Sequence, residues 1–321
     1  MKNILVIGSS NTDMIIRVPR IPKPGETIIG GTFSMAAGGK GANQAVAAAR
    51  AGGRVTFVAR VGDDIFGRQA RRNFEADGID IRFVASDASA PSGVALINVA
   101  DDGENAISVA SGANARLTPE DIRRGAAAFD GADIALIQLE TPLETVRAAV
   151  ETANDRGIPV ILNPAPAREL DDGILKNVTI LTPNESEAEI LTGIKVATES
   201  DAKRAAAALR ARGPRRVIIT LGEKGCYAAA DDFGGRIPAF RVRSVDSTAA
   251  GDVFNGALAV ALAERMVLVE ALRFASAAAA LSVTKLGAQP SAPARAEIEE
   301  FLDGRRGANA GSAYPGGAKK T

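Results

Sequence analysis

The stretch DSTAAGDVFNGALAVALAERM, residues 246–266, decides the fold because it joins a run of small residues to an apolar helix. The helix expected over Val253–Ala263 is apolar on nearly every side, which predicts that it is buried and that its start is held rigidly. Ala249–Gly251 place bare backbone amides at this helix N-terminus, where anions bind. Asp252 adds a carboxylate at the same point, and the helix dipole favours its ionised form.

An ionised aspartate beside an anion site suits phosphoryl transfer. The amides would hold the charge that develops on the transferring phosphoryl group, and Asp252 would accept the proton of the attacking hydroxyl. The alternative from the residues alone is that Asp252 is an ordinary acidic residue in the first turn of a helix. Both interpretations stay open until the other motifs are considered.

Composition excludes several classes of chemistry. The 321 residues are 46% hydrophobic, which is enough for one large α/β domain or two small ones. Lysine plus arginine (38) balances aspartate plus glutamate (38), so charge predicts neither a nucleic-acid nor a membrane partner. The absence of histidine excludes Ser-His-Asp and Cys-His catalysis and histidine-ligated zinc. Asp, Glu or Lys is left as the general base.

Features that report on location favour the cytoplasm. The single cysteine, Cys226, allows no intrachain disulfide, as expected in a reducing compartment. The N-terminal MKNILVIGSS lacks the pattern of a signal peptide. No apolar run reaches the roughly 18–20 residues of a membrane-spanning helix. We therefore expect a soluble cytoplasmic protein.

Short β-branched runs alternate with longer helical patterns along the chain. This alternation predicts an α/β fold whose central sheet is mostly parallel and flanked by helices on both faces. Ligands bind such sheets beyond the carboxyl ends of the strands. The expected strands are Asn3–Gly8, Val55–Val61, Asp133–Leu139, Pro159–Leu162, Val178–Leu181 and Val217–Leu221, and the other expected helices are Gly41–Ala51, Phe66–Asp77, Pro119–Phe129, Leu143–Arg156 and Asp201–Arg212.

Two segments, about 14–33 and 92–112, break the alternation. The second reads as a hairpin with its turn at Asp101–Gly103. Together they predict a small antiparallel β-lid over a site; two separate surface hairpins are the alternative. We expect one domain over residues 1–303 and, because residues 304–321 are rich in Gly, Ala and Lys without periodicity, a disordered tail.

A glycine-rich segment, residues 36–62, begins AAGGKGANQ. It does not fit a Walker motif because glycine follows Lys40, and no G-x-G-x-x-G opens a helix after a strand. Lys40 and Asn43 would place an ammonium and an amide at one corner, suited to hydroxyl groups. A purely structural turn is the alternative. The glycines that permit the tight turn are Gly38, Gly39 and Gly41.

Polar residues follow several of the predicted strands. Asn11 and Asp13 are two apart, so in an extended segment they share a face and can grip a vicinal diol. Turn chemistry explains the same pair equally well. Glu140 and Asn163 end two further strands, at the sheet edge where ligands are expected.

Two later segments offer phosphate and metal chemistry. Asn184 can cap a helix with Glu187 in its first turn, or Glu187 can order water around Mg²⁺. Thr220, Gly222 and Gly225 can wrap nucleotide phosphates with hydroxyl and backbone donors. A simple hairpin turn is the alternative for this last group.

Taken together, these motifs resemble the ribokinase-like sugar kinase family. Residues 38–62 and 246–259 match its two signatures in the family's order, and the likeness runs from Asn3 to about Ser291. The resemblance implies a central sheet with flanking helices and a β-lid that also forms a homodimer interface. It further implies transfer of the γ-phosphoryl group of ATP to a sugar hydroxyl.

The resemblance also implies a role for each matching position. It implies sugar binding by Asn11, Asp13, Gly39, Lys40, Asn43, Glu140 and Asp252, with Asp252 as the base, and an anion hole at Ala249, Ala250 and Gly251. It implies nucleotide binding by Asn184, Thr220, Gly222, Gly225 and Gly251, and a magnesium motif N-x-x-E whose Glu187 acts through water. Ser276 stands where a histidine often lines the adenine pocket, which puts that contact in doubt.

A monovalent cation activator, K⁺, is implied as well, held largely by backbone carbonyls. The run TKLGAQPS, residues 284–291, is similar to that of potassium-activated members. The matching positions are Asp246, Thr248, Ser282, Lys285, Gly287 and Ser291.

The acceptor expected from this resemblance is O5 of D-ribose. Alternatives within the class are 2-deoxyribose and fructose, and Asn11 with Asp13 favours a sugar with neighbouring hydroxyls. A nucleoside kinase would be expected to offer an aromatic or apolar wall for the base, and the lid segments supply few aromatic residues, clearly only Phe33, so a small polar sugar fits better. A non-catalytic sugar-binding regulator would be expected to lose Asp252 or Gly251, and both are present.

Overall fold

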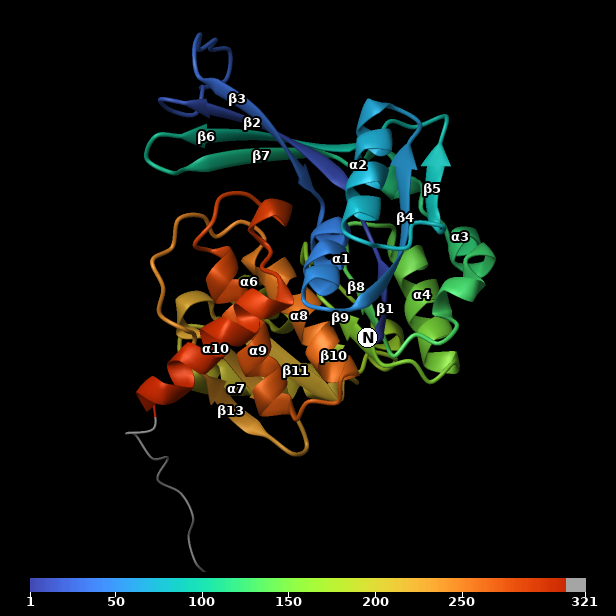
Figure 1. Ribbon diagram of the computed structural model, residues 1–321, viewed down its shortest axis with the longest axis vertical. Coiled ribbons are helices and arrows are strands. Elements are labelled where there is room, and N and C mark those ends of the chain that lie inside the picture. The colour runs from blue at the N-terminus through green and yellow to red at the C-terminus, as the bar shows by residue number, and fades with distance from the viewer. Residues whose placement is uncertain (310–321) are drawn as a thin grey trace, which may run out of the picture.

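A nine-stranded sheet forms the centre of the protein, which we describe over residues 1–309 of a computed structural model (Figure 1). Its strands are β1 (Asn3–Ile7), β4 (Arg54–Gly62), β5 (Val84–Asp87), β8 (Ile134–Ile137), β9 (Val160–Leu162), β10 (Ile180–Leu181), β11 (Arg216–Thr220), β12 (Cys226–Ala229) and β13 (Gly234–Ile237). They are arranged in the order β13-β12-β11-β10-β9-β8-β1-β4-β5. From β11 to β5 every neighbouring pair is parallel, and only the β11–β12 and β12–β13 pairs are antiparallel. The predicted α/β class is confirmed.

Helices cover both faces of this sheet and enclose two apolar cores. Alternate residues of β1 divide between them: Ile4 and Val6 lie in one core, Leu5 and Ile7 in the other. The first core is covered by α1 (Lys40–Arg50), α2 (Ile65–Ala76), α8 (Ala250–Ala263), α9 (Leu268–Ser282) and α10 (Arg295–Asn309). The second is covered by α3 (Pro119–Arg124), α4 (Leu143–Asp155), α5 (Asp172–Leu175), α6 (Glu185–Thr192) and α7 (Glu199–Ala211).

The expected elements are present with boundaries within two or three residues, with one exception. The helix predicted over Pro119–Phe129 is wrong in its second half. It stops at Arg124, and a short 3-10 turn, η2 (Ala126–Phe129), follows Gly125. Glycine is a poor helix former, so the chain changes direction there. Its start is as predicted, since Thr118 caps the helix in a capping box with Asp121.

Helix α8 is buried along almost its whole length, as its composition predicts. It packs closely on α1 because Gly256 has no side chain. A Cβ at Gly256 would lie 2.7 Å from both the Ala47 Cβ and the Gln44 carbonyl oxygen. The first turns of α1 and α8 are therefore held beside each other.

A second sheet projects from the body of the protein (Figure 1). It contains β2 (Asn11–Val18), β3 (Thr32–Gly38), β6 (Gly93–Ala100) and β7 (Asn105–Ala110), in the order β3-β2-β6-β7. Its outer pairs are antiparallel as predicted, whereas the central pair β2–β6 is parallel. The two segments thus form one lid sheet, which excludes the alternative of two separate surface hairpins.

The C-terminal prediction needs a correction. The tail was expected to begin at residue 304, but α10 continues to Asn309. The Arg305 guanidinium lies 4.3 Å from the centre of the Phe301 ring, and Arg305 donates to the Arg241 carbonyl, which ties the helix end to the body. The remaining predicted tail, 310–321, lies outside the described residues. Within residues 1–309 no helix is both long and apolar enough to cross a bilayer.

Candidate active site

The Asp252 carboxylate lies in the first turn of α8 and is only 6% exposed. Each of its oxygens accepts a hydrogen bond from a carboxamide of α1: Oδ2 from Asn43 Nδ2 at 3.0 Å, and Oδ1 from Gln44 Nε2 at 2.9 Å. Asn43 was predicted at this corner and Gln44 was not. A buried carboxylate requires such donors, because an unpaired one would be strongly destabilising.

The residues before α8 form a tight turn. Ala249 has φ 59°, a left-handed conformation that is strained for a residue with a Cβ. Within the described part of the chain, the amides of Ala249 and Gly251 have no hydrogen-bond partner. The prediction of three free amides is wrong for Ala250, whose N–H donates to the Ser247 carbonyl at 3.2 Å and closes the turn. An anion site of two amides remains, at the helix end where negative charge is favoured.

The glycine-rich turn before α1 lies against the loop that follows β1. Gly39 has φ 88°, and a Cβ there would lie 2.7 Å from the Asn11 amide nitrogen. A Cβ at Gly41 would lie 2.5 Å from the Ser9 amide nitrogen, and one at Gly38 would collide with the Asp13 carboxylate. Close approach to Ser9, Asn11 and Asp13 therefore requires glycine at these positions.

Asn11 and Asp13 lie on the same face of β2, as their spacing predicts. Asn114 fixes the first of them: its Nδ2 donates to Asn11 Oδ1 at 2.8 Å, and its Oδ1 accepts from the Ser10 amide at 2.9 Å. The side-chain nitrogen of Asn11, Nδ2, is therefore left to donate to a ligand. Sequence reasoning missed Asn114, because nothing in its local pattern separates it from a turn asparagine.

Acidic side chains converge on Lys40. Burial acts to lower the pKa of Lys40, but the charges of Asp252, Glu140 and Glu187 outweigh it and raise that pKa. Glu140 Oε2 accepts from the Lys40 amide at 2.9 Å and from the Ser9 hydroxyl at 2.5 Å.

The same crowding acts on the carboxylates. Burial, assisted by Glu140 and Asp252, raises the pKa of Asp13 to about 6. Burial also raises the pKa of Asp252, against the opposing effects of Lys40, Asn43 and Gln44. These pKa shifts mark a site in which several charges share a small, water-poor space.

On the expected nucleotide side, the capping interpretation of Asn184 is confirmed. Its side chain accepts from the Glu187 amide at 2.8 Å, and the Glu187 carboxylate accepts from the Asn184 amide at 2.8 Å. Thr220 bridges to Asn184 in a parallel pairing. The turn η3 (Gly222–Lys224) then leads through Gly225 into the β11–β12 hairpin, so this group has hairpin geometry, and its role toward a nucleotide stays a prediction.

The cation ligands that were expected fit this chain to different degrees. The Asp246 carboxylate accepts from the Thr248 amide and from the Gly287 amide, both at 2.9 Å, so it joins the two loops. The Ser282 hydroxyl donates to the Ala279 carbonyl within α9, the Ser291 hydroxyl donates to the Ala288 carbonyl, and the ammonium of Lys285 pairs with Glu297. Ser276 is buried on α9. Within residues 1–309 no group of three or more Asp, Glu or Cys side chains is placed to hold a metal ion.

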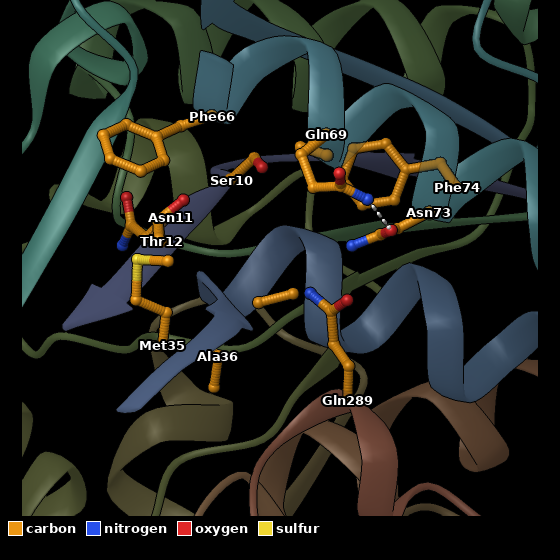
Figure 2. Close-up of a pocket in the computed structure, with 12 residues that line it drawn as sticks. Ser10, Asn11, Thr12, Met35, Ala36, Phe66, Gln69, Asn73, Phe74 and Gln289 are labelled. Atoms are coloured by element: carbon orange, nitrogen blue, oxygen red, sulfur yellow. Dashed lines mark hydrogen bonds between the residues drawn. The ribbon is translucent and has the colours of Figure 1, made fainter. Parts of the chain in front are cut away.

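A cavity of about 250 Å³ lies beside this site, between the base of the lid and α2 (Figure 2). Thr12 and Met35 of the lid, Phe66 and Asn73 of α2, and Gln289 line part of it. Among the predicted site residues its lining includes only Asn11. The cavity is therefore a neighbour of the charged site and not its centre.

Comparisons with known proteins agree on one family. The model of the pfkB family carbohydrate kinases matches residues 1–295. The chain is 46% identical over 302 residues to a ribokinase of Haemophilus influenzae, covering 94% of this chain and 99% of that protein. It is 42% identical over 301 residues to a deoxyribokinase of Salmonella typhi, covering 94% and 98%. The structure of Arabidopsis thaliana ribokinase complexed with ribose and ATP is similar with a TM-score of 0.88 at 34% identity, covering 94% and 98%.

The raised pKa of Asp13 predicts a pH-dependent gain in stability for Asp13→Asn. The folded state holds the Asp13 proton more tightly than the unfolded state, so ionisation of this carboxyl destabilises the fold, and Asn mimics the protonated form. The gain in Tm should grow as pH rises from about 4 to about 6 and then stay constant. Thermal unfolding of both proteins across this range measures it, with the exposed Asp155→Asn as the control. An equal Tm difference at every pH would contradict the prediction.

Proposed function

The chain belongs to the pfkB family of carbohydrate kinases, and we propose that it transfers the γ-phosphoryl group of ATP to O5 of D-ribose. The products are ribose 5-phosphate and ADP. The observation that carries the proposal is the buried Asp252 carboxylate beside the unpaired amides of Ala249 and Gly251. Phosphoryl transfer needs a base that accepts the proton of the hydroxyl and a site that stabilises the charge on the transferring group, and one helix start supplies both.

Binding of the sugar is assigned to the polar residues around Lys40. Asn11 Nδ2 and the unpartnered buried Asn43 Oδ1 are a donor and an acceptor for sugar hydroxyls. The carboxylates of Asp13 and Glu140 accept from further hydroxyls, which also separates their negative charges from each other. Several such contacts orient O5 toward Asp252.

Transfer then needs one proton and one phosphoryl movement. Asp252 accepts the proton of the ribose O5 hydroxyl as O5 attacks the γ-phosphorus in line. The bond from this phosphorus to the β–γ bridging oxygen breaks, and ADP leaves with the electron pair. The amides of Ala249 and Gly251 stabilise the charge on the transferring group.

ATP binding is assigned to Asn184, the Thr220–Gly225 turn and the small Ser276. Mg²⁺, when bound, neutralises charge on the phosphates. Glu187 would hold it through water, because one oxygen of its carboxylate is already used by the Asn184 amide.

Asp252→Asn should lower kcat for ribose by at least about 10²-fold, because an amide cannot accept the O5 proton. Since Asn keeps the shape of Asp, the KM for ribose should stay within about threefold. Initial rates of ADP formation with ribose measure both quantities. Asp155→Asn makes the same chemical change at an exposed site and should retain full activity. Near wild-type turnover in Asp252→Asn would remove Asp252 from the role of base.

A second candidate substrate is 2-deoxyribose, because a similar protein is a deoxyribokinase at 42% identity. Ribose is favoured because Asn11 and Asp13 suit neighbouring hydroxyls. The same assay with ribose, 2-deoxyribose, fructose and a nucleoside should give the highest kcat/KM with ribose. A higher value for another member of the panel would assign the activity to that substrate.

We also propose that K⁺ activates the enzyme from behind the anion site. The Asp246 carboxylate joins residue 248 to residue 287, so the loop that carries the cation ligands is tied to the turn before α8. A bound cation would stiffen this turn and hold the free amides in place.

Replacing K⁺ by tetramethylammonium at constant ionic strength should therefore lower kcat, since this ion is too large to be ligated by backbone carbonyls. The KM for ribose should change less, because none of the residues assigned to the sugar is among the expected cation ligands. Rates in the two chloride salts provide the comparison, and restoring K⁺ should restore kcat. Equal turnover in both salts would count against a cation site.

A homodimer through the lid sheet is a further proposal. The lid exposes large apolar side chains on both faces: Ile107 (56% exposed) and Val109 (54%) on the face of Asp13, Leu96 (53%) and Phe33 (60%) on the other. An equivalent lid of a second copy would cover them in a closed, symmetric contact.

ATP use and the single buried cysteine, Cys226, also fit a cytoplasmic location, which we propose.

The double variant Leu96→Glu with Ile107→Glu should convert the dimer to a monomer, because it places a carboxylate on each apolar face of the lid. Sedimentation velocity measures the change. Ile190→Glu is the matched control, since Ile190 is 58% exposed on α6, away from the lid, and should leave the mass unchanged. A monomeric wild type would refute the dimer.

A further inference from the structure

We propose that Gln44 is a positioning residue for Asp252, held in one orientation by a buried chain of polar side chains that also reaches the anion site. This inference rests on the proposed role of Asp252 as base. It concerns residues outside the assigned sugar and nucleotide contacts.

Every polar atom of the Gln44 carboxamide is used. Its Nε2 donates to Asp252 Oδ1 at 2.9 Å and to Asn163 Oδ1 at 3.0 Å, and its Oε1 accepts from Gln138 Nε2 at 2.6 Å. A flipped amide would point its oxygen at two acceptors and its nitrogen at a donor. Gln44 is fully buried, so water cannot replace these partners.

The chain continues from Gln44 to the other side of the site. Asn163 Nδ2 donates to the Thr182 carbonyl at 3.0 Å, and Thr182 Oγ1 donates to Asn255 Oδ1 at 2.7 Å. Asn255 Nδ2 then donates to the Gly251 carbonyl at 2.8 Å. Gly251 carries one of the free amides, so the base and the anion site are connected through buried polar side chains and the Thr182 carbonyl. Such networks hold a single geometry in a low-dielectric interior.

Gln138 is itself held in place by its surroundings. A side chain at Gly8 would collide with Gln138 Oε1, so the backbone of the loop after β1 packs directly against this carboxamide. Gln138 Oε1 has no hydrogen-bond partner, which leaves Nε2 as the only polar contact of this side chain.

Asn43 and Gln44 both donate to Asp252 but differ in whether another atom of the side chain is free for a ligand. Asn43 also has a free oxygen for the sugar, whereas Gln44 has no atom left for a ligand. The charged groups facing Asp252 are Lys40 of α1, Asp13 of β2, Glu140 after β8 and Glu187 of α6. Three of these four are acidic, so a neutral donor such as Gln44 helps to keep Asp252 ionised.

Gln44→Met, which keeps the length of the side chain but removes its polar atoms, tests the proposal. We expect kcat to fall at least about tenfold while the KM for ribose stays within about threefold. Loss of the donor favours the protonated form of Asp252, so the acid limb of the kcat profile should move to higher pH by about half a unit or more. Profiles are measured at saturating ribose, because Asp13 also titrates in the free enzyme.

Gln138→Met supplies a second, milder variant, because it leaves both donors of Gln44 in place and removes only the bond that orients them. Its acid limb should move in the same direction by less. Thr145→Val is the control: it removes one fully buried hydrogen bond, to the Leu117 carbonyl, outside this site, and should lower Tm without moving the acid limb.

The outcomes separate this inference from the proposed function. Unchanged kcat and an unmoved acid limb in folded Gln44→Met, or in Gln138→Met if the first variant does not fold, would overturn the positioning role. That result together with an inactive Asp252→Asn would leave the proposed function intact. Near wild-type turnover in Asp252→Asn would remove Asp252 from the role of base, and with it the premise of this inference, while the activity with ribose would remain.

Discussion

Two carboxamides of α1 meet one carboxylate of α8, and the organisation of the site depends on this contact. The partners are 208 and 209 residues apart in the sequence, so the site exists only when both ends of the chain have packed. Gly256 lets the helices come close enough, and the donors offset the burial of Asp252. The charged corner at Lys40 and the amides at the start of α8 are then fixed relative to each other, because they lie at the first turns of these two helices.

The features that form the site lower the stability of the fold. The charges of Glu140, Glu187 and Asp252 act on one ammonium group, that of Lys40, and burial is the main cause that raises the pKa values of Asp13, Glu187 and Asp252. Ala249 adds a strained backbone conformation at the anion site. Such features persist when the surrounding structure is rigid enough to hold them, and here two apolar cores and a largely parallel sheet supply the rigidity.

Sequence patterns predicted the α/β class and most of the elements, because β-branched runs and apolar periodicity are local signals. They also placed Asn11 with Asp13 on one face, and Asp252 at a buried helix start. They could not find Gln44, Asn114 or Asn255, whose roles come from partners distant in the sequence. The parallel pairing of β2 with β6, the paired amide of Ala250 and the helical end of the chain near Arg305 likewise depend on tertiary contacts.

Strand β2 has one further consequence. It begins with Asn11 and Asp13 in the site and continues without interruption to Val18 in the lid. Asn11, Asp13 and the lid residues of β2 are therefore parts of one continuous strand. A change in the tilt of the lid would be passed along this strand to Asn11 and Asp13, which couples the position of the lid to the placement of both side chains.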